Sequence, residues 1–272
     1  MLNLENISFK YNKGKSLILD DISLKIEDRS FTVIVGSNGS GKTTLSRIIA
    51  GSIKPTSGRY LLDNELITSD NYHLINSKIG YVFQNPEETF LTSNVEEEIA
   101  IGLEFGSKEK VDIYNIINKT SSELGISNLL SRNVNDISGG QMQKVAFASQ
   151  MVLDKEVMVL DEPFSMLDVK SKHEYWNFIM KNKVDKTYIL ITHDLTFSLF
   201  ASNIIVMKEG KILKQGKPSD ILLDRELLLS ANLLIPQSLQ MLIDKKGISK
   251  IKNLLNKGDE SKYLEEIENY ES

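Results

Sequence analysis

The segment 36–43 of the chain reads Gly-Ser-Asn-Gly-Ser-Gly-Lys-Thr and directly follows the apolar, β-branched run 31–35. The run predicts a buried strand, and the glycines let the loop curl so that successive backbone N–H groups point inward. A helix that begins near Lys42 directs its positive end at the same point. Lys42 can then reach the β- and γ-phosphates of a nucleotide, and the Thr43 hydroxyl can ligate Mg²⁺. The segment therefore predicts a nucleoside triphosphate site rather than a glycine- and serine-rich surface turn.

The composition is that of a globular protein, because 41% of the 272 residues are hydrophobic and 25% are charged. The formal net charge of −5 lacks the basic excess of a general nucleic-acid binder, so we expect no nucleic-acid partner. Cysteine is absent, which excludes disulfides and a thiolate nucleophile and fits a reducing cytosol. The first residues show no signal-peptide pattern, and the apolar runs are far shorter than a membrane span. A membrane role is therefore expected to come through a partner.

Short β-branched runs, separated by helical stretches, organise much of the chain. They lie at 31–35, 79–83, 157–160, 188–191 and 204–207. Continuous apolar runs of this kind predict the buried strands of a parallel sheet that helices cover on both faces.

Other patterns flank these strands. Residues 1–30 alternate apolar and polar side chains around a turn at 12–14, which predicts antiparallel strands at a sheet edge. Short strands are expected within 58–66, and Glu209-Gly210 predicts a tight hairpin. From about residue 86 to residue 154 the apolar period changes from two to 3.6 residues, which predicts a helical insertion.

The pattern becomes helical again after Pro218. We therefore predict a nucleotide-binding domain over 1–216 and a helical extension over 217–272, whose last dozen residues fray.

A second acidic motif supports the nucleotide site. Asp161 and Glu162 follow the apolar run 157–160. The strand would deliver Asp161 to its carboxyl end, where it can hold Mg²⁺ through water. Glu162 can orient and deprotonate the attacking water, so we assign it as the general base. A solvated acidic turn is the ordinary alternative for such a pair, but the phosphate loop upstream disfavours it.

Three single residues acquire a role only from their neighbours. His193 follows the strand 188–191 and could hydrogen-bond the γ-phosphate. Gln84 ends the run 79–83 and could contact Mg²⁺ or the attacking water. Tyr11 could stack on a purine base, although ordinary packing explains it equally well. His73 and His173 have no comparable setting and are expected at the surface.

Ser138, Gly139, Gly140 and Gln141 form a second motif suited to phosphate. Ser138 resembles a helix N-cap, and the two glycines allow a phosphate to approach the start of a helix over 142–151. A capped helix without ligand is the alternative. Because the chain already has one phosphate cradle, this second anion site suggests a surface offered to the nucleotide of another molecule.

The order of these motifs resembles that of an ABC-type ATPase. It comprises the phosphate loop, Gln84, the Ser138 motif, the Asp161-Glu162 pair, a Ser-Met-Leu-Asp segment at 165–168, and His193. The resemblance covers about residues 1–216. It implies an α/β P-loop NTPase core of RecA-like type, an antiparallel β subdomain, an ABC-specific helical insertion and a C-terminal helical extension.

The same resemblance implies a site shared between two subunits. ATP and Mg²⁺ would lie between the phosphate loop of one subunit and residues 138–141 of the other, with Asp168 at the seam. Nucleotide contacts are implied for Tyr11 and for the loop residues Gly36, Ser37, Asn38, Gly39, Ser40, Gly41, Lys42, Thr43 and Thr44. Metal contacts are implied for Thr43, Gln84 and Asp161, and catalytic contacts for Lys42, Gln84, Glu162 and His193.

A narrower resemblance points to the ATPase subunits of energy-coupling-factor transporters, which import vitamins and transition-metal ions. The segments 83–88 and 95–104 carry it, together with 165–168 and 191–195. It implies a transmembrane coupling subunit, a substrate-binding membrane subunit and a paralogous second ATPase, although a homodimer stays open. It also implies a peripheral location at the cytoplasmic face of the cell membrane. The acidic pair Glu87-Glu88 would suit basic residues of the coupling subunit.

The chain departs from the family pattern at Thr89, Lys144, Phe164 and Val169, but no departure removes a catalytic group. Three other functions are alternatives to an energy-coupling-factor importer. An ABC transporter of another class has the same motor. A soluble ABC-type ATPase acting on DNA or ribosomes usually carries a coiled coil or two motor domains, which this chain lacks. A regulator without turnover is disfavoured because Glu162 and His193 are retained.

Overall fold

The computed structural model describes residues 1–11, 16–104, 110–182 and 185–257. The chain forms two compact units, one made of Met1–Tyr72 and Ile189–Ser272, the other of His73–Tyr188. The predicted turn at 12–14 and the predicted fraying at the end of the chain lie outside the described residues. In the described ranges, no helix combines the length and the hydropathy of a membrane-spanning segment.

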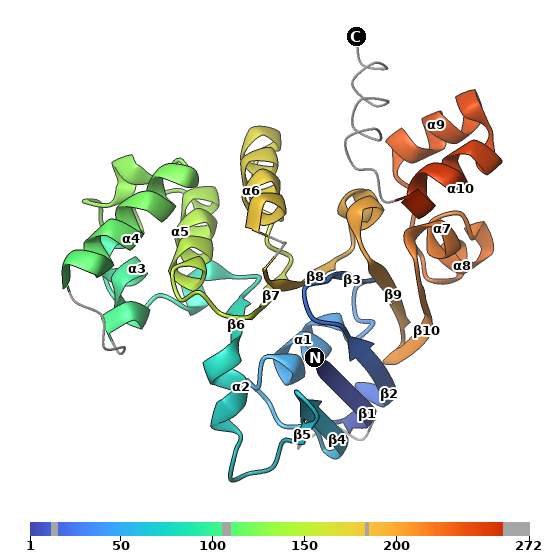
Figure 1. Cartoon of the computed structure of the whole chain (residues 1–272), viewed down its shortest axis with the longest axis horizontal. Helices are drawn as coiled ribbons and strands as arrows, with labels where there is room; N and C mark the ends of the chain where they lie inside the picture. Colours follow the sequence, from blue (N-terminus) through green and yellow to red (C-terminus); the bar gives the residue numbers. More distant parts are fainter. Residues whose placement is uncertain (12–15, 105–109, 183–184, 258–272) are drawn as a thin grey trace. The chain divides into compact units, whose positions relative to one another are not determined.

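The first unit contains an antiparallel sheet with the strand order β2-β1-β4-β5 (Figure 1). Its strands are β1 (Leu2–Phe9), β2 (Leu19–Ile26), β4 (Ser57–Leu62) and β5 (Glu65–Leu66). Leu4 on β1 lies opposite Leu24 on β2 and Tyr60 on β4, and all three side chains are buried. The sequence predicted antiparallel strands at the edge of a sheet. The antiparallel pairing of β1 with β2 is confirmed, but these strands form a sheet of their own with β4 and β5, which is the antiparallel β subdomain that the family resemblance implied.

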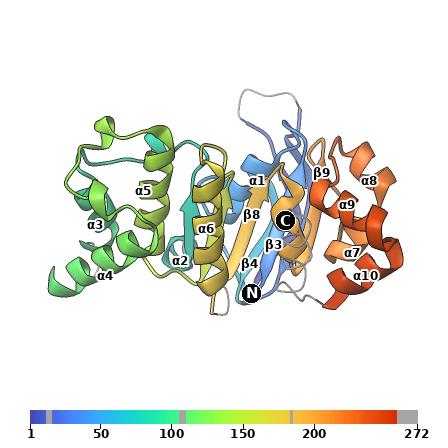
Figure 2. The same cartoon turned by 90° about the horizontal axis from the view of Figure 1, so that it is seen from above.

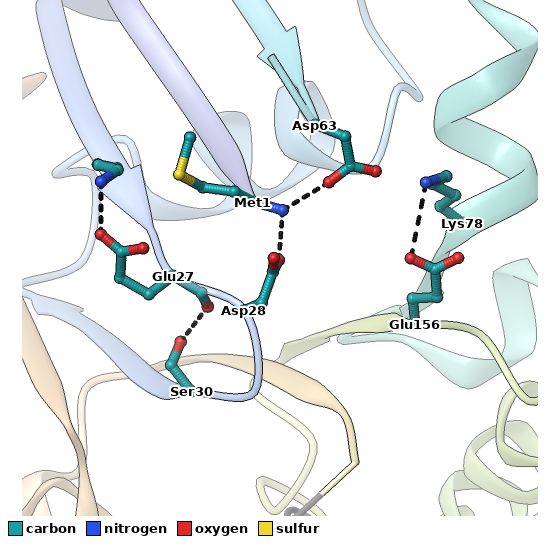
Figure 3. A network of polar contacts seen from close by, with 8 residues as sticks. Met1, Glu27, Asp28, Ser30, Asp63, Lys78 and Glu156 are labelled. Atoms are coloured by element: carbon teal, nitrogen blue, oxygen red, sulfur yellow. Dashed lines mark hydrogen bonds and ion pairs between the residues drawn. The ribbon is translucent and has the colours of Figure 1, made fainter. Parts of the chain in front are cut away.

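The amino group of Met1 fastens the start of β1 to two turns of this sheet (Figure 3). It donates hydrogen bonds to the carboxylates of Asp28 and Asp63, and the second bond is 2.6 Å long. The Asp63 N–H donates in return to the Met1 carbonyl at 2.8 Å. Asp63 begins the turn between β4 and β5, so the contact closes that end of the sheet.

The second set of strands in this unit positions the phosphate loop. It has the order β10-β9-β3-β8, with β3 (Phe31–Gly36) parallel to β9 (Asn203–Lys208). All six residues of β3 are buried, as expected for an inner strand of a parallel sheet. The hairpin predicted at Glu209-Gly210 is confirmed, since it joins β9 to the antiparallel strand β10 (Lys211–Gly216). β8 (Thr187–Thr192) enters the unit from the other part of the chain, and helix α1 (Lys42–Ile49) contacts β3.

Within residues 217–257, which the structure describes, four helices follow β10, as the pattern after Pro218 predicted. They can be followed in Figure 2. They are α7 (Pro218–Ile221), α8 (Arg225–Ser230), α9 (Gln237–Lys246) and α10 (Ile248–Lys257). α7 contacts β9 and β10, and α10 contacts α7 and α9. Buried leucine and isoleucine side chains, such as Leu242 and Ile251, form their core. The domain boundary at 216 stays a prediction, because these helices share one compact unit with the strands.

The second unit combines two parallel strands with the predicted helical insertion. β6 (Ile79–Val82) pairs with β7 (Val157–Asp161), and Tyr81 lies opposite Val159. Helix α2 (His73–Lys78) contacts β6, and Lys78 and Glu156 form an ion pair of 3.7 Å near the starts of these strands (Figure 3). Helix α3 (Val95–Glu104) contacts α4 (Lys110–Glu123) and α5 (Gly139–Met151). The remaining elements are η1 (Pro86–Glu88), η2 (Ser127–Leu129), η3 (Val134–Asp136) and α6 (Val169–Asn182).

Candidate nucleotide site

The last residue of β3, Gly36, leads into the phosphate loop and has no room for a side chain. A Cβ atom on Gly36 would lie 2.4 Å from the Met207 carbonyl oxygen and 2.7 Å from Ser40 Oγ. Gly41 has a φ of +98°, and a Cβ there would lie 2.8 Å from Leu19 Cδ2. The tight curl expected from the glycines is therefore present, and neighbouring strands press on it from two sides.

Lys42 places its ammonium inside this curl. Its side chain is buried, and Nζ donates to the carbonyl oxygens of Gly36 at 2.8 Å and Ser37 at 3.1 Å. Helix α1 begins at Lys42, and no side chain among the described residues caps its N-terminus. The residues of its first turn, all of which the structure describes, include no aspartate or glutamate. The first N–H groups of a helix point out of its N-terminal end, where the helix dipole favours an anion. The positive charge of Lys42 and the start of α1 therefore meet at the loop.

The chemistry of the loop fits a triphosphate. Ser40 Oγ is buried and has no hydrogen-bond partner among the described residues. Thr43 is half-buried and Thr44 is buried, while Asn38 and Gly39 are exposed. The orphaned hydroxyl and the ammonium are both groups that phosphate oxygens would satisfy.

The β9–β10 hairpin supports the loop in a way that the sequence did not reveal. The Gly210 N–H donates to the Ser40 carbonyl at 3.1 Å, and the Gly210 carbonyl accepts from the Asp20 N–H at 2.9 Å. Gly210 has a φ of +77°, and a Cβ there would lie 2.4 Å from the Ile18 carbonyl oxygen. The sequence predicted this turn from its glycine, but the contact with Ser40 joins segments far apart in the chain.

In the second unit, Asp161 ends β7 with a fully buried carboxylate. The Tyr81 hydroxyl donates to Asp161 Oδ2 at 2.9 Å from the neighbouring strand β6. A charge-assisted hydrogen bond of this kind fixes the orientation of the carboxylate. No feature of the sequence identified Tyr81, because its role depends on the pairing of β6 with β7.

Glu162 follows directly, with a backbone φ of 48° in the left-handed region. A residue with a side chain rarely adopts this conformation, and such residues often occur at functional sites. Its carbonyl accepts hydrogen bonds from Gln143 Nε2 and from the Ser165 N–H, both at 3.2 Å. The Glu162 side chain is 9% exposed. The turn therefore holds this carboxylate close to the end of the strand.

The Ser138 motif forms the capping box of α5. The Gln141 N–H donates to Ser138 Oγ at 3.4 Å, and the Ser138 N–H donates to Gln141 Oε1 at 2.9 Å. The predicted N-cap is confirmed, but the helix begins at Gly139 rather than Met142, because the glycines already belong to its first turn. A Cβ on Gly140 would lie 3.0 Å from the Met166 carbonyl oxygen. Ser138 and Gly139 are exposed, so this helix start is accessible.

Asp168 is exposed and accepts a hydrogen bond of 2.8 Å from the Ser171 N–H. This backbone hydrogen bond, assisted by the positive charge of Lys144, lowers the pKa of the Asp168 carboxyl below its usual value. The residue predicted at the subunit seam is therefore a stable anion.

The remaining predicted residues lie at strand ends. Gln84 is exposed after β6, and His193 is exposed after β8. Tyr11 is 48% exposed, and its ring meets that of Phe9 edge to face at 4.9 Å. His73 and His173 are exposed, as predicted. The structure thus assembles Lys42 with its loop in one unit and Asp161, Glu162 and the Ser138 helix in the other, while the nucleotide contacts of these residues stay predictions.

Taken together, the lysine-filled phosphate loop, the strand ending in Asp161 and the capped helix start define an ATPase of the P-loop class. The family profile described as "ABC transporter" matches residues 19–165, and the chain belongs to this family. It is therefore an ATPase whose hydrolysis of ATP is coupled to transport.

Curated relatives give a more particular likeness. The chain is 40% identical over 229 residues to the energy-coupling factor transporter ATP-binding protein EcfA1 of Mycoplasmopsis pulmonis, covering 84% of this chain and 86% of the relative. It is 38% identical over 256 residues to the protein EcfA of Onion yellows phytoplasma, covering 94% of this chain and 93% of the relative. The energy-coupling-factor resemblance read from the motifs is thereby confirmed.

Solved structures confirm the predicted α/β P-loop fold. Clostridium perfringens cbiO1, described as part of the ABC transporter complex cbiONQ, matches with a TM-score of 0.74 and 28% identity, over 94% of this chain and 98% of that one. A dimeric ATP-binding cassette in a post-hydrolysis state, bound to ADP and Pi, matches with a TM-score of 0.73 and 26% identity, over 79% of this chain and 98% of that one.

Proposed function

We propose that this chain is the ATP-hydrolysing subunit of an energy-coupling-factor importer, bound peripherally at the cytoplasmic face of the cell membrane. The observation that carries the proposal is the identity of 36–40% with curated energy-coupling factor ATP-binding proteins along most of the chain. By analogy with that class, the imported substrate would be a vitamin or a transition-metal ion, chosen by a separate membrane subunit.

The nucleotide contacts would come from the phosphate loop. Residues 36–44 would bind the phosphates of ATP, with Lys42 leaving the carbonyls of Gly36 and Ser37 to reach the β- and γ-phosphates. Tyr11 would stack on adenine. In the described ranges, no group of three or more acidic or histidine side chains could hold a metal by itself. Thr43, Gln84 and Asp161 would therefore supply few Mg²⁺ ligands, and phosphate oxygens and water the rest.

Hydrolysis would proceed by in-line attack of water on the γ-phosphorus. Glu162 would accept a proton from the water as its oxygen bonds to phosphorus and the bond to the ADP oxygen breaks. Lys42 would offset the charge that develops on the phosphate oxygens, and His193 would donate a hydrogen bond to the γ-phosphate. When bound, Mg²⁺ would supply further charge compensation.

A second ATPase subunit would complete each site. Its residues at 138–141 would meet the γ-phosphate held by this chain, and the ionised Asp168 would lie at the seam. A paralogous partner is favoured over a second copy of this chain. The stretch after Gln84 would receive the coupling subunit, whose basic residues would pair with Glu87, while the Glu88 side chain lies outside the described part.

Replacement of the base tests the chemistry. Glu162→Gln should lower phosphate release by about 10²-fold or more while ATP binding is preserved. Glu156→Gln, which removes the ion pair with Lys78 elsewhere in the unit, is the control and should hydrolyse ATP normally. Unchanged hydrolysis in Glu162→Gln would contradict the assignment of the base.

Affinity purification from detergent-solubilised membranes tests the transporter class. We expect recovery of a second ATPase subunit and a transmembrane coupling subunit, identified by mass spectrometry. Recovery of an unrelated permease instead would favour an ABC transporter of another class.

A further inference from the structure

Gln143 is a fully buried polar residue on α5, one position beyond the first turn. Both ends of its amide are used: Nε2 donates to the Glu162 carbonyl at 3.2 Å, and Oε1 accepts from the Met166 N–H at 3.1 Å. A buried amide satisfied at both ends fixes the groups that it joins, because breaking either bond leaves a buried polar atom unpaired.

The two groups that Gln143 joins belong to functional segments. Glu162 has the left-handed backbone conformation described above, and its carbonyl receives Gln143 in addition to the Ser165 N–H. Met166 lies two residues before Asp168, and its carbonyl lies 3.0 Å from the Cβ position of Gly140. The helix start at Ser138 and the turn that presents Glu162 therefore meet through one side chain.

We propose that Gln143 is a positioning residue that holds the Glu162 backbone in its catalytic conformation and ties it to the Ser138 end of α5. This inference rests on the proposed function. There, Ser138 serves the nucleotide held by the partner subunit, whereas Glu162 serves the nucleotide of its own subunit. Gln143 would thus transmit a displacement of α5 at one shared site to the general base of the other.

The position of Gln143 requires a side chain that is both a hydrogen-bond donor and an acceptor. It must donate to a carbonyl and accept from an N–H at the same time, which glutamine does in its neutral state. Methionine has a similar shape but satisfies neither group. An ionised glutamate accepts from Met166 but cannot donate to Glu162. A protonated glutamate can do both. Burial raises the pKa of a carboxyl group, so the protonated form gains population at a higher pH than it would in an exposed glutamate.

Steady-state ATP hydrolysis by the full transporter complex tests the proposal with these variants. Gln143→Met should lower kcat about tenfold or more and leave the KM for ATP within about twofold. At each pH, the kcat of Gln143→Glu is divided by the kcat of the wild type. This ratio should increase as the pH is lowered from about 8 to about 6. The ratio removes the pH dependence that the wild-type reaction already has, and the Gln143→Met ratio should stay flat.

Tyr175→Phe is the matched control. The Tyr175 hydroxyl donates to the Gln143 backbone carbonyl at 3.1 Å, and its ring lies 4.4 Å from that of Phe147. The variant removes a buried hydrogen bond to the same residue but leaves the amide contacts intact. It should lower the thermal unfolding midpoint and retain kcat within about twofold, because the base stays in place.

Retention of kcat in Gln143→Met, a flat profile in Gln143→Glu, or an equal loss in Tyr175→Phe would each overturn the proposal, leaving Gln143 a packing residue. If Gln143→Met does not fold, the pH profile of Gln143→Glu decides alone. A wild-type complex without ATP hydrolysis would contradict the proposed function, and this inference with it. A wild-type complex that hydrolyses ATP, with a Gln143→Met complex of equal kcat, would contradict the inference alone.

Discussion

Gly36 and Gly39 occupy the same loop but face different surroundings. A Cβ on Gly36 would collide with the Met207 carbonyl at 2.4 Å, whereas one on Gly39 would meet nothing within 4 Å. Gly39 does have a φ of +79°, which other residues adopt at a cost of about 1–2 kcal/mol. Gly36 is therefore required because a side chain would not fit, whereas Gly39 is favoured because its backbone conformation suits glycine.

We predict that Gly36→Ala is the more harmful substitution. Relieving its backbone contact must shift β9 or the loop, and overpacking of this kind costs about 1–3 kcal/mol. The displaced loop should also bind ATP more weakly. Urea denaturation and ATP titration measure both effects, with Gly39→Ala as the control that loses stability but keeps more of its affinity. Equal losses of affinity in the two variants would contradict the steric account.

Some residues of the candidate site could be predicted from the sequence, and others could not. Lys42, Asp161 and Glu162 were predicted because each stands next to a recognisable strand or helix. Tyr81 and Gln143 were not, because their partners lie 80 and 19 positions away along the chain. A hydrogen bond between distant segments leaves no local pattern, so positioning residues emerge only from the fold.

Among the elements, the helix ends were the most predictable. Ser138 was expected to cap a helix, and it does so with Gln141 as a capping box. The start of α5 was placed three residues too late, because two glycines read as loop although the capping box brings them into the first turn. The alternating pattern predicted the N-terminal strands only as antiparallel strands at a sheet edge, and the antiparallel subdomain came from the family resemblance, since their pairing with β4 joins segments 49 to 60 residues apart.

One helix end also makes a pH-dependent contact. Asp224 caps α8 by accepting from the Leu227 N–H at 3.0 Å, and Lys214 on β10 donates to its other oxygen at 2.8 Å. The hydrogen bond from Lys214, followed by that from the Leu227 backbone, lowers the pKa of Asp224 below its ordinary value of 3.8. The folded state therefore binds this proton less readily than the unfolded state.

The contribution of Asp224 should be present above its ordinary pKa and be lost as the pH falls through the lowered folded value. Asp224→Asn keeps a capping oxygen but loses the charge, so its unfolding midpoint should fall below that of the wild type at neutral pH. The difference should be small, as for other exposed ion pairs. It should begin to shrink near pH 4, the ordinary pKa of the group, and vanish only below the lowered pKa of the folded state. Thermal scans across this range measure it. Lys214→Met should show the same trend, and a difference independent of pH in both variants would contradict the assignment.

At the scale of the whole molecule, each part of the site is local to one unit. The first unit contains the phosphate loop, the hairpin that supports it and the C-terminal helices. The second contains Asp161, Glu162 and the exposed start of α5. Ser138 and Gly139 at this helix start are exposed. In the proposed pairing of two ATPase subunits, they would contact the ATP that the partner subunit binds.

Native mass spectrometry tests this pairing most directly, since it counts subunits and nucleotides in one spectrum. The sample is Glu162→Gln with ATP and Mg²⁺, together with the ATPase subunit that co-purifies with it, or alone if none does. We predict a species of two ATPase subunits with two nucleotides that disappears when ATP is omitted or when Lys42→Ala replaces the loop lysine. Single subunits that each carry a nucleotide, with no paired species at any concentration, would contradict the account.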